Sequence, residues 1–274
     1  MSTRERSGDT GKVSVVDLKA EKKNYSCILS DGEKLELSVE TVSEFSLYQG
    51  KELSENLLDR IRRYQNLQKT VQKGRRILST KPFSKDEMAS KLKNYEQVGK
   101  ALDQLEEEGL IDDDSLAKLL AEEYSEKGFS AFGIQQELRR RKLDPESISK
   151  ALEGLDTNQD SVKQIALKAL KSGSGKESLA KLKQRAIRAL SRKGFSLSEC
   201  SRIVDDAVSE LGETLGESRE RDALIDNLRE LRTNLEKTLQ DSFALRIKLR
   251  AKLISRGFDP GMVDSVMDEE GVGR

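Results

Sequence analysis

Basic side chains, clustered at several places, are the residues of this chain best suited to chemistry. Guanidinium and ammonium groups bind phosphates or carboxylates through charge and hydrogen bonds. The main clusters lie at 75–76, 139–142, 181–193 and 246–252. A solvated helix face with favourable charge near a helix C-terminus is the competing interpretation of each cluster. The residues predicted to contact a partner protein or DNA phosphates are Arg75, Arg76, Arg139, Arg140, Arg141, Lys142, Lys183, Arg185, Arg188, Arg192 and Lys193.

The chain lacks most of the residue types that usually carry out covalent catalysis or bind metal ions. Histidine is absent, which excludes His-dependent nucleophilic sites and His metal ligands. Cys27 and Cys200 cannot form a zinc site alone, and the position of Cys200 is typical of a helical core. The acidic triplet at 112–114 suits a helix N-terminus, and Gly-Ser-Gly at 173–175 lacks the Lys-Ser/Thr ending of a phosphate loop. We therefore expect no catalytic residue, no metal and no cofactor, in a protein that is not an enzyme.

Charge is balanced over the whole chain but strongly banded along it. There are 49 basic and 49 acidic residues. Residues 61–100 carry 11 basic and 3 acidic side chains, 101–126 carry 1 and 10, and 161–202 carry 11 and 2. A protein that binds free nucleic acid is usually net basic. Alternating bands favour docking against a large partner with mixed charges.

A short pattern that predicts helix starts recurs along the chain. It consists of an apolar residue, then Ser or Asp, and a second apolar residue four positions after the Ser or Asp. The Ser or Asp would cap the first free N–H groups, while the apolar residues close a hydrophobic staple. Glu87 and Glu199 complete capping boxes. The predicted cap residues are Ser54, Ser84, Asp112, Ser130, Asp144, Ser196 and Asp259.

Short corners between these helices predict an array of three-helix repeats. Gly128, Gly194 and Gly257 directly precede the Phe of such a start, so one helix ends where the next begins. We expect a mainly α protein, an elongated array of about four three-helix repeats preceded by a small N-terminal β domain. The predicted parts are a disordered tail at 1–12, a β domain at 13–50, a linking helix with repeat 1 at 51–110, and repeats 2, 3 and 4 at 111–158, 159–211 and 212–274.

The β domain is predicted from a strand at 13–18 and a hairpin around Asp31-Gly32. Alternating apolar residues at 25, 27, 29 and at 35, 37, 39 share one face only if the loop has an odd length. A three-residue loop would then pair Leu29 with Leu35 and Cys27 with Leu37. No further region rich in strands is expected.

Residues 217–256 contain neither Gly nor Pro, and Leu224, Leu228, Leu231 and Leu235 follow a 4-3-4 spacing. One interpretation is a coiled-coil dimer seam, but the pattern covers few heptads. The favoured alternative is a pair of helices that folds onto the array.

The chain begins with polar residues and has no apolar run near the ~20 residues needed to cross a bilayer. We therefore expect a cytoplasmic protein without membrane contact, and a monomer.

Several segments resemble the RecX family. They are LEEEGLIDDDSLA at 105–117, KGFS at 127–130, IQQEL at 134–138, KLDPESI at 142–148 and RAIRALSRKGFS at 185–196, followed by Ile203-Val204. The resemblance covers about residues 13–210. Two departures stand out: Lys142 replaces the glycine usual at its corner, and 212–274 extends beyond the core pattern, although RGFDP at 256–260 reads as a further repeat.

The resemblance implies a negative regulator of the RecA recombinase. Family members are curved three-helix-repeat proteins that bind the RecA–single-stranded-DNA filament and limit its growth, ATPase, strand exchange and co-protease activity. They thereby modulate DNA repair, homologous recombination and the SOS response. The partners so implied are the RecA filament and single-stranded DNA. The alternative hypothesis is a helical nucleic-acid-binding protein that acts on DNA directly.

Overall fold

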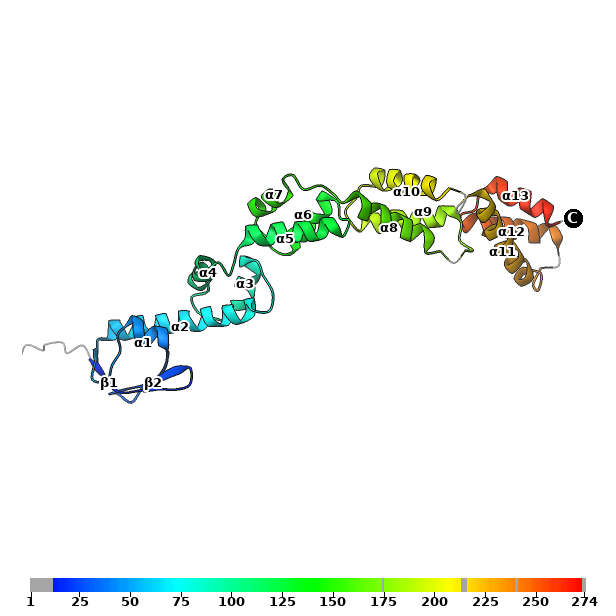
Figure 1. Ribbon diagram of the computed structural model, residues 1–274. Helices are drawn as coiled ribbons and strands as arrows, with labels where there is room; N and C mark the ends of the chain where they lie inside the picture. Colours follow the sequence, from blue (N-terminus) through cyan, green and yellow to red (C-terminus); the bar gives the residue numbers. More distant parts are fainter. Residues whose placement is uncertain (1–11, 174, 213–215, 240, 273–274) are drawn as a thin grey trace, which may run out of the picture. The chain divides into compact units, whose positions relative to one another are not determined.

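The computed structural model describes residues 12–173, 175–212, 216–239 and 241–272. The chain is mainly α-helical with one small N-terminal sheet, as predicted (Figure 1). It divides into two compact units, one covering the chain up to Ala117 together with Arg140–Ser147, the other covering Lys118–Arg139 and the chain from Ile148 onward. Almost all of the predicted disordered tail, residues 1–11, lies outside the described residues.

The sheet has the strand order β3-β2-β1-β4. Its strands are β1 (Val13–Ala20), β2 (Asn24–Leu29), β3 (Lys34–Ser38) and the short β4 (Glu52–Leu53), and all neighbours pair antiparallel. One face buries Val15, Cys27 and Leu37 against Leu58 and Ile61 of the first long helix. The strand β4 lies in a region where the sequence predicted helices only.

The hairpin has the odd-length loop that the sequence predicts, but its register differs by two residues. Leu29 N–H donates to Glu33 O at 2.9 Å, so the loop is 30–32, and Cys27 pairs with Leu35 instead of Leu37. Gly32 explains the difference: its φ of +88° places it at the left-handed last position of a three-residue loop. The apolar residues still share a face because a shift of two preserves parity.

The strand also ends earlier than expected. Ser38 caps a short helix, α1 (Val39–Glu44), by accepting from Thr41 N–H, so Val39 starts a helix and is 53% exposed.

The remainder of the first unit packs helices on α2 (Glu55–Leu78). These are α3 (Lys85–Leu92) and α4 (Val98–Glu107), and their shared core includes Val71, Met88, Leu92 and Leu105. Helices α5 (Asp113–Glu126), α6 (Ala131–Arg140) and α7 (Pro145–Leu152) contribute residues to both units.

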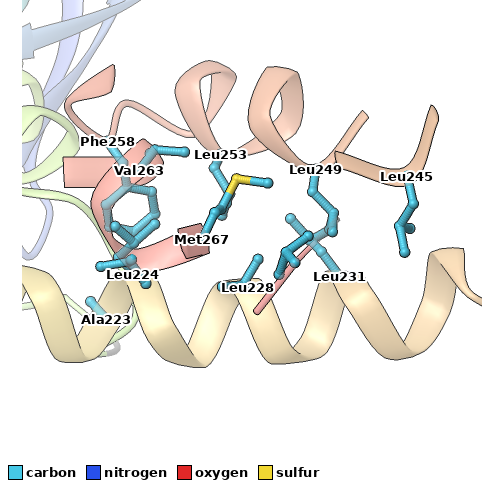
Figure 2. Packing of buried hydrophobic residues seen from close by; sticks show 12 residues of the cluster. Ala223, Leu224, Leu228, Leu231, Leu245, Leu249, Leu253, Phe258, Val263 and Met267 are labelled. Carbon is cyan, nitrogen blue, oxygen red and sulfur yellow. The ribbon is translucent and has the colours of Figure 1, made fainter. Parts of the chain in front are cut away.

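The second unit contains two further three-helix clusters. Helices α8 (Gln159–Lys171), α9 (Leu179–Ser191) and α10 (Leu197–Leu211) share one core, in which Cys200 is fully buried, as the sequence predicts. Helices α11 (Glu217–Leu235), α12 (Ser242–Ser255) and α13 (Pro260–Glu269) share another (Figure 2). Leu224, Leu228 and Leu231 are buried in this second core, so the leucines fill an intramolecular interface, as the favoured alternative expects. The two helices pack with each other and with α13 in a core of their own, however, and not onto the preceding helices as predicted.

All of the predicted helix starts are confirmed. Each of the cap side chains accepts a backbone N–H in the first turn of the helix that follows it, and Glu87 and Glu199 complete the expected capping boxes. Within the described residues, no helix combines the length and apolarity needed to span a bilayer.

Candidate partner-binding face

Helix α9 presents an apolar face to its own core and a basic face on the other side. Ser178 caps the helix by accepting from Lys181 N–H. Leu182, Ala186 and Leu190 recur at four-residue spacing and are fully buried against α8 and α10. The helix contains no acidic residue, so its outward side chains are basic or neutral.

The outward side chains line one hollow of about 410 Å³. Its residues are Glu177, Lys181, Gln184, Arg185, Arg188 and Arg192. The four basic residues follow a 4-3-4 spacing, which places them along one face of a helix. We call these four, with Gln184, the α9 basic face.

Most of the positive charge on this face has no internal counter-ion. Arg185 Nη2 donates to Glu177 Oε1 at 2.5 Å, while Arg185 Nη1 is buried without a hydrogen-bond partner. Lys181, Arg188 and Arg192 form no ion pair with the part of the chain that the structure describes. Lys181, Arg188 and Arg192 can therefore attract an anionic surface without first breaking internal ion pairs.

Two residues predicted from the same cluster do not join the face. Lys183 Nζ lies 2.8 Å from Asp205 Oδ1 of α10. Lys193 Nζ lies 3.9 Å from the centroid of the Phe129 ring, a cation–π contact. Burial lowers the pKa of the Lys193 ammonium, and the nearby charge of Lys127 lowers it further. Both side chains serve contacts within the protein.

The basic run at 139–142 is also partly committed to internal contacts. Arg141 Nε donates to Glu87 Oε1 at 2.8 Å, and Arg141 Nη2 donates to Glu87 Oε2 at 3.2 Å. Partial burial alone would raise the pKa of Glu87, but the hydrogen bonds from Arg141 and from Ser84 N–H hold it below its usual range. Lys142 Nζ donates to Ser90 Oγ at 2.9 Å, and Arg139 is exposed without an ion pair among the described residues.

The remaining predicted residues also include one that is held by an internal ion pair. Arg75 makes a two-pronged contact with Glu108, with distances of 2.9 Å and 2.5 Å. Arg76 is exposed and has no ion pair in the described part of the first unit. Arg140 is exposed on α6 but has an interaction partner within the protein.

The structure thus brings together Arg185, Arg188 and Arg192 from the predicted set and adds Lys181 and Gln184. Helical spacing carries the signal for Lys181, because 181, 185, 188 and 192 follow one face. Gln184 has no charge to attract attention, and only its position in the folded helix includes it.

Comparison with known proteins places this face in a family context. A family profile described as "RecX, third three-helix domain" matches residues 156–204, which contain α8, α9 and the first half of α10. A regulatory protein RecX of Acinetobacter baylyi is 30% identical over 125 residues, which cover 44% of this chain and 77% of that protein. The chain belongs to the RecX family.

Longer RecX relatives match nearly the whole chain. The regulatory protein RecX of Enterococcus faecalis is 28% identical over 269 residues, covering 90% of this chain and 93% of that protein. The Bacillus subtilis protein of the same name is 24% identical, with coverage of 93% and 98%. A crystal structure of a regulatory protein RecX shares the fold with a TM-score of 0.58 at 22% identity, over 71% of this chain and 99% of that one. The α9 basic face lies within the matched third three-helix domain of RecX.

Proposed function

We propose that this chain is a negative regulator of RecA. It binds the RecA–single-stranded-DNA filament and limits filament growth, ATP hydrolysis, strand exchange and co-protease activity, and thereby modulates DNA repair and the SOS response. Membership in the RecX family supports the regulatory role, and the α9 basic face, with three basic side chains free of internal ion pairs, carries the proposal of filament binding.

The contact is electrostatic in character. A nucleoprotein filament exposes DNA phosphates and acidic protein side chains, and both attract arginine and lysine. Arginine binds either group with paired hydrogen bonds. Arg188 and Arg192 are exposed, one turn apart, and available for such bonds.

Several modest contacts on one scaffold add up through effective concentration. A chain that touches more than one RecA protomer holds the filament in one arrangement and opposes the changes that accompany growth and ATP turnover. This role needs surface complementarity only, and no residue of the chain needs to take part in bond making.

The decisive measurement is RecA ATPase on single-stranded DNA with and without this protein. We expect inhibition by the natural sequence. The variant Arg188→Glu/Arg192→Glu should need a roughly tenfold higher concentration for half-maximal inhibition, because repulsion replaces attraction at two contacts.

The matched control is Lys168→Glu/Lys171→Glu on α8. It changes net charge by the same amount and also places acids near a helix C-terminus, so its cost in helix stability is comparable. The control should inhibit like the natural sequence. Absence of inhibition by the natural sequence would contradict the proposed function, whereas equal inhibition by both variants would contradict the choice of face.

A second candidate function is direct DNA binding, which the same free basic side chains favour. It predicts binding to single-stranded DNA without RecA. With three phosphates neutralised, the logarithm of the binding constant should fall with the logarithm of salt concentration at a slope of about −2. A fluorescence-anisotropy titration at two salt concentrations separates the two functions.

A further inference from the structure

The outer face of α12 carries two large apolar side chains that the protein does not cover. Phe243 is 68% exposed and Ile247 is 53% exposed. They are four residues apart and therefore neighbours on the helix surface, and the exposed Ala251 extends the stripe by another turn. The core does not need them, because the inner face of α12 packs through Leu245, Leu249 and Leu253 (Figure 2).

Free positive charge borders this stripe. Lys248 and Lys252 are exposed and form no ion pair within the described residues. Two arginines of the same helix are held internally: Arg246 lies 2.7 Å from Asp268 and Arg250 lies 2.7 Å from Asp264. By helical spacing the two lysines lie on the side of the stripe next to Ala251, whereas the Arg250–Asp264 pair lies beside Phe243 and Ile247. Lys248 and Lys252 therefore supply the free positive charge near the stripe.

Helix α12 differs here from α9, its counterpart in the preceding cluster. When the cap residues Ser178 and Asp241 are aligned, Ile247 corresponds to Gln184 and Ala251 corresponds to Arg188. The face that is basic on α9 is thus apolar with a lysine border on α12. The α9 face therefore suits a charged contact, whereas the α12 face suits a contact that is mainly apolar.

We propose that this face of α12, defined by Phe243, Ile247, Lys248 and Lys252, docks an acidic amphipathic segment of the regulated partner protein. The inference rests on the proposed function and adds a second, apolar contact to the charged one on α9. Apolar side chains of the segment cover Phe243 and Ile247, and its carboxylates pair with the two lysines. A buried aromatic anchor surrounded by polar contacts is the arrangement that contributes most to binding at protein interfaces.

The charges and the size of the stripe argue against other occupants. A second copy of the same face would bring lysines of equal charge together. A lipid surface favours a helix with a wide apolar face, whereas α12 offers two large side chains outward and buries its remaining leucines.

The test uses binding of the full chain to RecA filaments on single-stranded DNA. Phe243→Gln/Ile247→Gln should weaken binding roughly tenfold. The fold should persist, because both side chains are exposed and Gln is a better helix former than Phe or Ile. A matched control is Phe132→Gln on α6. Phe132 is 61% exposed and also stands two residues after its cap, but the polar Gln136 follows it at the fourth position. The control should bind like the natural sequence.

The contribution of Lys248 and Lys252 to binding is tested with separate variants. Lys248→Glu/Lys252→Glu should weaken filament binding, whereas Lys248→Arg/Lys252→Arg should preserve it. Because the stripe is apolar, the loss from Phe243→Gln/Ile247→Gln should persist at high salt, where the loss from Arg188→Glu/Arg192→Glu shrinks.

The outcomes distinguish the two proposals. Failure of the natural sequence to bind filaments would overturn the proposed function. Filament binding by the natural sequence with unchanged affinity in Phe243→Gln/Ile247→Gln would overturn the α12 inference alone. Two further results would also overturn that inference. One is a dimer of the natural sequence in sedimentation that is lost in Phe243→Gln/Ile247→Gln. The other is binding of the natural sequence to vesicles of phosphatidylcholine and phosphatidylglycerol that is lost in the same variant.

Discussion

The hydroxyl of Ser178 donates to the backbone carbonyl of Arg256 at 2.9 Å, across 78 positions of the chain. Ser178 also caps α9, so one buried side chain starts a helix and holds the corner that follows α12. The arrangement recurs three helices earlier: Ser130, the cap of α6, donates its N–H to Lys193 O at the corner after α9.

A third instance lies in the first unit, where the hydroxyl of Ser84, the cap of α3, donates to Arg141 O after α6. In each case the accepting residue precedes one with positive φ, namely Lys142, Gly194 or Gly257. The left-handed residue ends the helix, and the carbonyl before it accepts a hydrogen bond from a cap residue distant in sequence.

Replacing Ser178 by Ala should destabilise the protein by about 2 kcal/mol, because the helix loses its cap and a carbonyl loses its partner. Ser54→Ala is the control, since within the described residues the Ser54 hydroxyl makes a single hydrogen bond, accepting from Leu57 N–H to cap α2. It should cost about 1 kcal/mol. Urea unfolding followed by circular dichroism measures both, and equal losses would show that the bond to Arg256 contributes nothing.

Gly133 and Gly99 should respond to Ala in opposite directions. A Cβ on Gly133 would lie 2.1 Å from Lys193 O, so Gly133→Ala should destabilise by about 2 kcal/mol or more. A Cβ on the exposed Gly99 of α4 meets nothing within 4 Å, so Gly99→Ala should stabilise by about 0.5–1 kcal/mol through helix propensity. Thermal unfolding of the two variants checks the signs, and a stable Gly133→Ala protein would refute the close backbone contact.

Lys142→Gly should stabilise the corner after α6 by about 1 kcal/mol. Lys142 has a φ of +56°, a left-handed conformation that is costly for any residue with a Cβ. Lys142→Ala keeps this strain and loses the hydrogen bond to Ser90, so it should give no gain. Chemical denaturation ranks the three proteins, and the idea of strain fails if Gly and Ala behave alike.

The Glu87–Arg141 pair should make stability depend on acid pH. The folded protein lowers the pKa of Glu87 from its ordinary 4.5, so the stabilisation is complete at neutral pH. It declines as pH falls below that ordinary value and is lost once the pH passes the folded-state pKa. Glu87→Gln removes this contribution.

The free energy of unfolding of Glu87→Gln, measured between pH 7 and pH 3, should therefore fall less steeply than that of the natural sequence. An identical slope would show that Glu87 titrates normally in the folded protein.

Helix starts could be predicted residue by residue because capping is local. A cap hydroxyl or carboxylate and the N–H that it binds are two or three residues apart, so the pattern around Ser84 or Ser196 contains all that the contact needs. Hairpin parity was predictable for the same reason. The register was not, because it depends on the left-handed conformation of Gly32 at the end of the loop.

The candidate site was predictable only in part. The basic clusters are visible in the sequence, but Arg75, Arg141 and Lys183 are neutralised by partners 33, 54 and 22 positions away. Nothing near these residues in sequence distinguishes them from the free Arg188 and Arg192.

A series of capped helices with tight corners after an N-terminal hairpin could be read from the residues alone, because those features arise from contacts within a few residues. Which basic side chains remain free, which corner carbonyls meet which cap serines, and which face of α12 stays uncovered became known from the packed helices. Those outcomes depend on groups that are far apart in the chain and become neighbours only when the helices pack.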